Sequence, residues 1–308
     1  MSSSCPICSC NDIKLCDAYR GDNEIFHGLM LAKCSSCGMV FASPMPSNDA
    51  LAKYNLKYFS SAHGGISKSP EALAFFSAIS RLRIAYLERY LDSEKVQIST
   101  VLEFGPGPGF FAACWLERYP KTIYQAFETD MSCHDSLKKL GIQVIDFDSL
   151  MAPITQVDLV VMSHVLEHVN SPREFLENAT KRLKKNGIIF IEVPCLDFKY
   201  KLLDEPHLLF FDKQQMYNLL KLSGFEIIDL SYFGQAINAL QSSFSLFTFW
   251  IRMRSKLISL GLVLPFALHR SGLETLINSL EVAVIAPFKA HRQSAKPARW
   301  LRVIAKKI

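Results

Sequence analysis

The sequence lacks several features that would assign it to common classes of protein. It has no apolar stretch of the roughly 18–20 residues that a membrane-spanning helix needs. It has no internal repeat and no low-complexity tract, which argues against a solenoid and against disorder. Its first residues, MSSSCPICSC, show no basic segment followed by an apolar run, so we expect no secretory signal and a cytoplasmic location. The nine cysteines are therefore expected to be thiols or metal ligands and not a disulfide framework.

The composition is that of a globular protein with an uneven distribution of charge. Of the 308 residues, 49% are hydrophobic and 20% are charged, which suits one large domain and one small one. Residues 236–308 hold eleven Lys/Arg and two Asp/Glu, a net charge of +9, which leaves −4 for residues 1–235 out of the total of +5. This basic, apolar tail suggests an anionic partner, and a solvated basic surface is the simpler alternative.

Apolar strand patterns alternate with helical ones through the middle of the chain. We expect strands near 98–104, 123–128, 142–146, 157–163, 187–193 and 225–231. We expect helices near 71–91, 109–118, 131–140, 171–185 and 212–223, with Gly187 placed to stop the fourth of them. RWLRVIAKK, at 299–307, is expected to form a last strand. This order predicts an α/β fold with a mostly parallel, Rossmann-like sheet and helices on both faces.

The chain divides into four predicted segments. These are a small cysteine-rich module (1–46), a linker with an amphipathic helix that forms a cap or lid (47–97), the α/β core (98–234), and an apolar basic tail (235–308). FSLFTFWI and LISLGLVLPFAL in the tail are too short to span a membrane. We therefore expect a helical insertion packed on the domain before the last strand. A helix lying on an anionic membrane surface, at the inner face, is the alternative.

Two pairs of cysteines in the first segment have the spacing of a zinc site. Cys5 and Cys8 form one CxxC knuckle, and Cys34 and Cys37 form a second. Four thiolates on two tight turns suit tetrahedral zinc, and four protein ligands leave no position for water. We expect a structural zinc ion, although Cys10 and Cys16 are close enough in sequence to compete as ligands.

The stretch VLEFGPGPGFF predicts a strand that runs into a ligand-binding turn. Gly105 and Gly107 fit the dinucleotide pattern G-x-G-x-x-G, but its sixth position is Phe110 and the third glycine, Gly109, comes one place early. The Gly-Lys-Ser/Thr of a P-loop is absent. The turn, with Glu103 before it on the strand, lets the backbone approach a ligand closely without placing a diphosphate.

Acidic residues follow the next two predicted strands. Glu128 comes 23 residues after Gly105, where a carboxylate can accept hydrogen bonds from both ribose hydroxyls, and Asp130 competes for this role. Asp146 and Phe147 end the third strand, where a carboxylate and a ring could meet an adenine. Asp146 could equally be an ordinary turn residue.

In this order, VLEFGPGPGFF, AFETD, VDLVVMSHVLEHV, FLENATKRLKKNGIIFIEVP and PHLLFFDKQQMYNLLKLSGFEII resemble class I methyltransferases that use S-adenosylmethionine (SAM). The likeness covers about 98–233. CPIC…CSSCGMVFASPMPS followed by YNLKYF is similar to the zinc-binding module of sugar-modifying methyltransferases from polysaccharide and antibiotic pathways. The resemblance implies that the three glycines line the methionine side of SAM, with Glu103 on the strand before them. Glu128 would bind the ribose, Asp146 and Phe147 would lie by the adenine, and Ser163 would lie beside the sulfonium.

The chain departs from the best-known enzymes with such a module. Those methylate sugar carbon, carry a Glu-His pair before Tyr-Phe, and have a further C-terminal domain. Here the corresponding stretch is EPHLLFF, in which the pair is broken, and the chain has no room for the extra domain. A hydroxyl acceptor on a sugar nucleotide or glycan intermediate is thus at least as well supported as a carbon acceptor.

A hydroxyl acceptor must lose a proton, which requires a nearby base. His207, after the fifth strand, is the first candidate, and His164, after the fourth, is the second. Tyr58, with Tyr54, could close over the acceptor, or both could serve packing. His168 is expected to be structural.

Two other functions remain as alternatives. One is methylation of RNA or another macromolecule, with the basic tail binding phosphate. SHVL is unlike the Asn/Asp-Pro-Pro-aromatic motif of base-amino methylases, and among basic residues only Lys33 adjoins the knuckles, so we do not expect nucleic acid to be a partner. The other alternative is a non-catalytic SAM-binding or scaffold protein.

Overall fold

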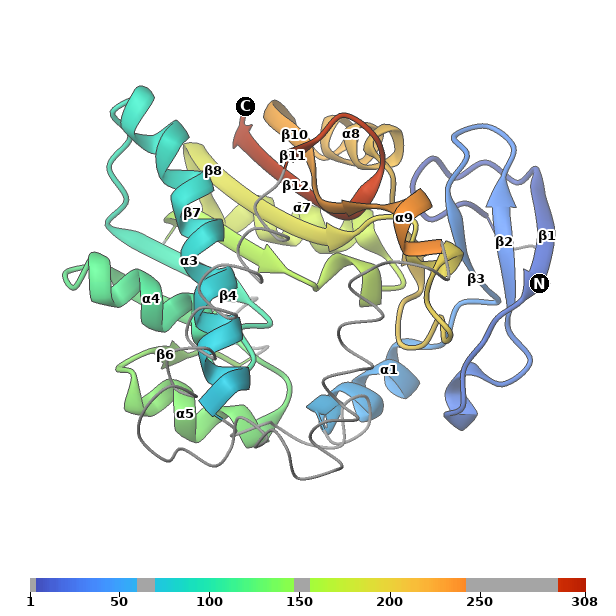
Figure 1. Ribbon diagram of the computed structural model, residues 1–308, viewed down its shortest axis with the longest axis horizontal. Coiled ribbons are helices and arrows are strands. Elements are labelled where there is room, and N and C mark those ends of the chain that lie inside the picture. The colour runs from blue at the N-terminus through green and yellow to red at the C-terminus, as the bar shows by residue number, and fades with distance from the viewer. Residues whose placement is uncertain (1–3, 60–69, 147–155, 242–292) are drawn as a thin grey trace, which may run out of the picture.

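A computed structural model of the chain describes residues 4–59, 70–146, 156–241 and 293–308 (Figure 1). Phe147 and most of the expected helical insertion lie outside these residues. The described chain forms an eight-stranded sheet, in the order β11-β10-β12-β8-β7-β4-β5-β6, and a four-stranded sheet, in the order β1-β2-β3-β9. Among the described residues, no helix combines the length and the hydrophobicity needed to cross a membrane.

The eight-stranded sheet is mostly parallel, as predicted. Its five parallel strands are β4 (Thr100–Phe104), β5 (Ile123–Phe127), β6 (Gln143–Val144), β7 (Val157–Ser163) and β8 (Leu183–Pro194). The predicted last strand is confirmed as β12 (Ala298–Lys307), which runs antiparallel between β8 and β10 (Phe225–Ala236). β11 (Gln293–Ser294) pairs with the outer side of β10, and the short helix α9 (Ile237–Gln241) follows β10.

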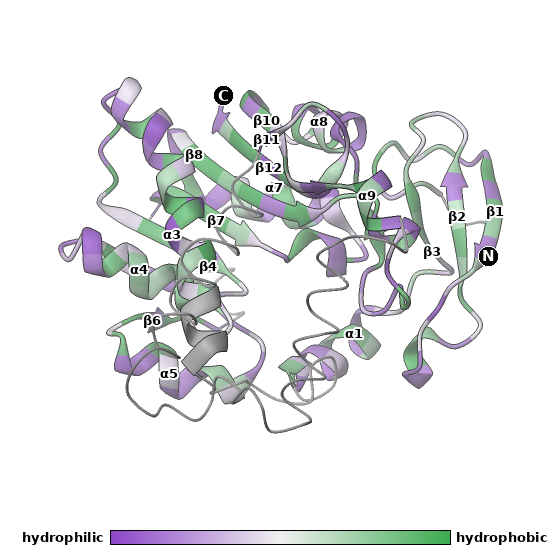
Figure 2. Ribbon diagram, viewed as in Figure 1, coloured by the Kyte–Doolittle hydropathy of each residue, from purple (hydrophilic) through white to green (hydrophobic). Residues whose placement is uncertain are grey.

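Helices cover both faces of this sheet because successive strand residues point to opposite sides. Val101 on β4 packs in a core with residues of α3 (Pro70–Ser93) and α4 (Phe110–Arg118), on the side that also takes up α5 (His134–Lys139). Its neighbour Leu102 packs in a second core with α7 (Pro172–Arg182) and α8 (Lys213–Leu222). The central strands are accordingly coloured mostly as hydrophobic in Figure 2.

Some predicted boundaries were wrong. The helix expected over 171–185 ends at Arg182, and β8 begins at once because Leu183 is buried and pairs with Val157 of β7. The glycine after it therefore lies inside a strand. The helix expected over 131–140 is divided into η2 (Met131–Cys133), capped by Asp130, and α5. The strand expected over 142–146 keeps only the two residues of β6.

The N-terminal residues form a small sheet at one side of the core (Figure 1). It consists of β1 (Ile13–Ala18), β2 (Met30–Cys34) and β3 (Val40–Ser43), with η1 (Glu24–Phe26) between the first two and α1 (Asn48–Asn55) after the third. Its fourth strand, β9 (Leu209–Phe210), comes from the far end of the core and pairs antiparallel with β3, Phe41 opposite Leu209. The sheet is thus built from two distant parts of the chain.

Candidate active site

The three glycines of the turn after β4 all adopt positive φ, at 60° for Gly105, 57° for Gly107 and 90° for Gly109. A Cβ on Gly105 would lie 2.9 Å from the Val165 side chain, and one on Gly107 would lie 2.9 Å from the ring of Phe59. Neither the backbone angles nor the space admits another residue without strain. The turn is therefore bare backbone, exposed at Gly105 and covered at Gly107 by the ring of Phe59.

Glu128 and Asp130, the two candidates for the ribose contact, have different roles. Glu128, directly after β5, accepts hydrogen bonds from the N–H of Gly107 and of Asp130, both at 2.8 Å, and burial raises the pKa of its carboxyl. Asp130 is buried and accepts from the N–H of Ser132 through one oxygen and from the N–H of Phe59 through the other. Asp130 therefore holds the local fold together. Glu128 is partly exposed and keeps lone pairs for a ligand.

Glu103, Asp146 and Ser163 were the other predicted cofactor residues that the structure describes. Glu103 is buried and accepts a hydrogen bond from the Tyr124 hydroxyl at 2.7 Å, and burial raises its pKa to about 7. A direct cofactor contact by Glu103 stays a prediction, as does one by Asp146, which is exposed. The hydroxyl of Ser163, at the end of β7, is buried and has no hydrogen-bond partner among the described residues. A buried hydroxyl without a partner is unfavourable, and a polar group of a bound cofactor would supply one.

Tyr58 and Phe59, shortly after α1, connect the glycine turn with a group of histidines. The ring of Tyr58 lies 5.6 Å from that of Phe59, which covers Gly107, and 5.4 Å from that of His168. Burial raises the pKa of Tyr58, so its phenol gives up its proton less readily and no phenolate is available as a base. Tyr58 therefore forms part of a wall that spans both regions.

His164, the second candidate base, lies between two buried carboxylates. Its Nδ1–H donates to Glu167 at 3.1 Å, and its Nε2 lies 3.3 Å from Glu192. Although burial opposes the charged form, these two hydrogen bonds raise the pKa of His164. Arg83 and Arg302 also donate to Glu192 and, against the effect of burial, hold its pKa well below the usual range. Both ring nitrogens of His164 face carboxylates, so neither offers a free lone pair to the proton of an acceptor.

His207, the first candidate base, faces a carboxylate with only one of its two ring nitrogens. It is buried, and its Nδ1–H donates to Asp197 at 2.6 Å, in the short helix η4 (Asp197–Lys199) that follows β8. Asp197 is also buried and pairs with Lys201 at 3.0 Å, and both partners, acting against burial, hold its pKa below the usual range. Because the ionised Asp197 binds Nδ1–H, the lone pair of His207 lies on Nε2.

His168 packs edge-on against His207, with ring centroids 4.8 Å apart. It belongs to η3 (Leu166–His168), which follows β7, and its Nδ1–H donates to the Pro206 carbonyl at 3.2 Å. Burial lowers the pKa of His168 to about 4, so this ring is neutral. A structural role was predicted for His168, and its contact with Pro206 fits one.

The loop that carries His207 is tied to the N-terminal sheet. Arg20 donates to both carboxylate oxygens of the fully buried Asp204, and Glu205 accepts from the N–H groups of Asp22 and Asn23. The Tyr54 hydroxyl donates to the other oxygen of Glu205. Further bonds run from the Tyr19 hydroxyl to the His207 carbonyl and from Leu208 N–H to the Glu167 carbonyl.

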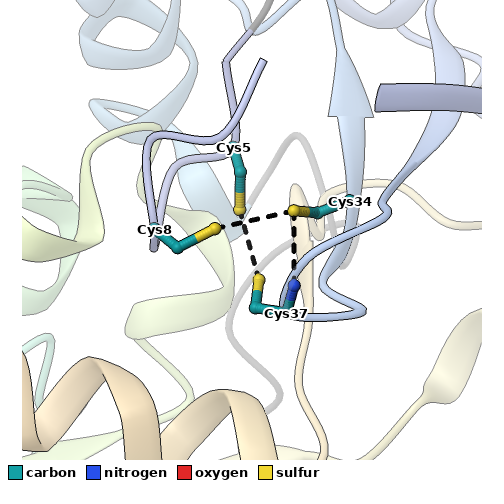
Figure 3. A group of neighbouring side chains, drawn as sticks. All are labelled: Cys5, Cys8, Cys34 and Cys37. Carbon is teal, nitrogen blue, oxygen red and sulfur yellow. Dashed lines mark hydrogen bonds between the residues drawn. The ribbon is translucent and has the colours of Figure 1, made fainter. Parts of the chain in front are cut away.

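The four predicted cysteine ligands converge on one point (Figure 3). The sulfur atoms of Cys5 and Cys37, and those of Cys8 and Cys34, are 3.5 Å apart, and all four lie within 4.8 Å of one another. A tetrahedral zinc ion with Zn–S bonds of about 2.3 Å places its sulfurs about 3.8 Å apart, so the cluster fits one. Cys10 and Cys16, the predicted competitors, are not in the cluster. The Asp12 N–H donates a hydrogen bond to the Cys10 sulfur, and the Cys16 thiol donates one to the Lys14 carbonyl.

A comparison with known protein families shows which family the chain belongs to. Residues 72–230 match a family described as a methyltransferase domain, and they include the glycine turn, Glu128 and the histidine group. The chain belongs to this family. The protein is a methyltransferase, with the α/β fold that the resemblance implied. The glycine turn, Glu128 and Ser163 are where the resemblance places SAM, and their contacts with it stay a prediction.

Several solved structures are similar to the methyltransferase. One from Archaeoglobus fulgidus, a SAM-dependent methyltransferase, is 17% identical over 81% of this chain and 98% of its own, with a TM-score of 0.46. The plantazolicin methyltransferase BamL is 14% identical over 84% and 98%, with a TM-score of 0.49. A possible histamine N-methyltransferase from Thermotoga maritima is 14% identical over 75% and 91%, with a TM-score of 0.44. No curated protein sequence matches the chain.

The methyltransferase brings together His164, His168, His207 and Tyr58, which the sequence singled out separately. Sequence reasoning missed the carboxylates of Glu167, Glu192 and Asp197, which orient the histidines. A signal existed for Glu192, because a carboxylate inside the apolar strand FIEVP is unusual unless it has a partner. Asp197 and Glu167 had no such signal, since neither lies inside an apolar strand.

Proposed function

We propose that this methyltransferase transfers a methyl group from SAM to a hydroxyl of a sugar nucleotide or a related glycan intermediate. The observation that carries the proposal is the buried Asp197–His207 pair, which keeps an imidazole lone pair at the carboxyl edge of the sheet. Tyr58 connects this pair, through His168, with the glycine turn. A base at this place is needed for a hydroxyl acceptor but not for an acceptor that is already a nucleophile.

The reaction needs alignment more than activation of the donor, since the sulfonium is already a good leaving group. The hydroxyl oxygen attacks the methyl carbon, the carbon–sulfur bond breaks with its electrons going to sulfur, and His207 Nε2 takes the hydroxyl proton. The products are a methyl ether and S-adenosylhomocysteine. Asp197 stabilises the imidazolium that forms, and Tyr58 helps to keep water away.

The surroundings of β8 support an anionic acceptor. A hollow of about 470 Å³ lies beyond its carboxyl end, between Leu196, the start of α9 and Pro297. Its described lining includes Lys199 and Lys296 and no carboxylate. The diphosphate of a sugar nucleotide carries the charge that this lining favours. Lys296 also fits contact of 235–308 with an anionic membrane surface, which stays a prediction, as does a location at the inner face.

The cysteine cluster supports a second part of the proposal, a structural zinc ion held by Cys5, Cys8, Cys34 and Cys37. Four thiolates complete the coordination of zinc, so the ion would have no position for the acceptor. Its contribution would be to the fold of the N-terminal sheet, and through β9 to the loop that carries His207.

The test is incubation of the enzyme with labelled SAM and candidate nucleotide sugars, followed by mass analysis of the products. We expect His207→Ala to lower turnover by about 10²- to 10⁴-fold, the usual contribution of a positioned base, with little change in SAM affinity. His27→Ala, in an exposed part of the N-terminal module, is the matched control and should leave both unchanged. Full turnover by His207→Ala would remove this residue from the mechanism. SAM binding without turnover on any nucleotide sugar would favour a non-catalytic role.

A further inference from the structure

Three side chains near the proposed acceptor site bring potential metal ligands together. Glu167, His168 and His207 each offer one ligand atom, and these atoms all lie within 4.8 Å of one another. Two of them come from η3 after β7, and the third comes from the loop after β8. They therefore meet at the carboxyl edge of the sheet, about 130 residues along the chain from the cysteine cluster and chemically distinct from it.

Each of the three side chains is held from behind by a second group. His207 Nδ1–H donates to Asp197, His168 Nδ1–H donates to the Pro206 carbonyl, and one oxygen of Glu167 accepts from His164. Histidines that bind metals usually donate their other ring N–H to a carboxylate or a backbone carbonyl, which fixes the ring and its tautomer. Both histidines here show this pattern, and in both the lone pair lies on Nε2.

Two of the potential ligand atoms lack the hydrogen-bond partners that buried polar atoms normally have. Glu167 Oε2 and His168 Nε2 are buried and have no hydrogen-bond partner among the described residues, and Glu167 as a whole is 1% exposed. With its proton on Nδ1, His168 offers Nε2 only as an acceptor, and Nε2 lies 3.8 Å from Glu167 Oε1, another acceptor on the same carboxylate as the unpartnered Oε2. Two buried acceptors that face each other stabilise neither one. A cation between them would satisfy both, together with His207.

We propose that Glu167, His168 and His207 form a binding site for a divalent first-row transition-metal ion. Two imidazoles and one carboxylate suit zinc, iron, manganese or cobalt, and three protein ligands leave coordination positions open. The four thiolates of the cysteine cluster select zinc, whereas this site prefers ions that accept nitrogen and oxygen. The methyltransferase would then hold two ions of different kinds.

The consequence for catalysis rests on the proposed function. An acceptor hydroxyl at an open position would lose its proton more readily, because a bound cation stabilises the alkoxide. With an ion present, His207 would be a ligand and the hydroxyl proton would pass to solvent water. Without an ion, His207 accepts that proton itself. Binding of the ion can be measured without any acceptor, so the site can be tested apart from the reaction.

The test is a titration of the full-length protein with Mn²⁺, carried out with zinc retained on the cysteines. The electron paramagnetic resonance signal of free Mn²⁺ measures how much of the ion is bound. We expect one bound Mn²⁺ per chain. Asp197→Asn, which alters only the group behind His207, should weaken binding by about 10- to 100-fold, and Glu167→Gln, which removes a ligand, should weaken it more. Glu226→Gln is the charge-matched control, because Glu226 pairs with Lys306 at the opposite edge of the sheet.

A second measurement keeps the proposal testable if a variant does not fold. Pulsed spectroscopy of Mn²⁺ bound to the unaltered protein should show coupling to the nitrogens of two imidazoles. Absence of bound Mn²⁺, absence of nitrogen coupling, or equal binding by folded Glu167→Gln would overturn the site. Methyl transfer by a protein that binds no Mn²⁺ would overturn the site and leave the proposed function standing. Specific binding of Mn²⁺ without methyl transfer to any hydroxyl would support the site and overturn the proposed function.

Discussion

Substitution of Arg20 should show that the N-terminal sheet positions the loop that carries His207. Arg20→Met removes two hydrogen bonds to Asp204, which is 0% exposed, and leaves that carboxylate with only the Arg20 N–H. Breaking a buried pair by removing one partner costs about 3–5 kcal/mol. The Arg20 side chain is itself 41% exposed, so water can replace part of the interaction, and we expect a loss at the lower end, about 3 kcal/mol.

The reciprocal change should cost less. Asp204→Asn leaves a neutral amide in the core and a guanidinium that water still reaches, so we expect a loss of about 1–2 kcal/mol. Which of the two variants loses more stability therefore shows which charge the fold buries. Arg81→Met is the control, because Arg81 pairs with Glu117 on the surface, with both side chains more than half exposed, and should cost less than about 1 kcal/mol.

Activity should follow the same interaction. His207 N–H donates to the Asp204 carbonyl at 2.8 Å, so a displaced Asp204 also displaces the imidazole. A misplacement of about 1 Å can lower turnover by about 10²-fold, whereas SAM affinity should change little because the glycine turn is not touched. Urea unfolding, turnover and calorimetric SAM binding measure the three quantities. Our reasoning fails if Asp204→Asn is the more costly change, or if Arg20→Met keeps full turnover.

Three further predictions concern the cofactor site, pH and zinc. Gly107→Ala should weaken SAM binding at least about 10-fold, because its φ of 57° and the Phe59 ring at 2.9 Å force the turn to shift; unchanged calorimetric affinity would show that this turn does not hold SAM. Burial raises the pKa of Glu103 from 4.5 to about 7, so the native state binds more protons than the unfolded state in this range, and stability should fall by about 3 kcal/mol as pH rises through it. Glu103→Gln should abolish that slope in urea unfolding measured at several pH values, and a slope that persists would assign it to another group. Removal of zinc by a chelator should unfold the N-terminal sheet, seen by circular dichroism, and lower turnover by freeing β9; a variant without the four cysteines that folds normally would contradict this.

Local patterns were sufficient to predict the sheet and the glycine turn. Strands such as β4 and β7 are apolar runs bounded by turn residues, and the antiparallel β12 was recognised from RWLRVIAKK alone. The spacing of the cysteines likewise anticipated a cluster that the fold brings together. These features depend on residues that are close in sequence, or on a fixed chemistry of ligands.

The errors arose where distant residues decide the outcome. Lys184, Lys185 and Gly187 carry the usual signals for the end of a helix, yet the pairing of Leu183 with Val157 begins the strand before them. The roles of Asp197 and Glu167 depend on which histidine the fold places beside each. A one-dimensional pattern shows that a carboxylate is present, but not which of the neighbouring histidines its oxygens face.

The pairing of β3 with β9 determines how this enzyme could be recombined with its relatives. A chimera that exchanged residues 1–46 alone would bring a foreign β3 against the native β9, and a foreign residue at position 20 against Asp204. The smallest transplantable unit therefore consists of two pieces, the N-terminal segment and the stretch from about 196 to 211. Acceptor preference, if it resides in this unit, would have to be inherited from both pieces at once.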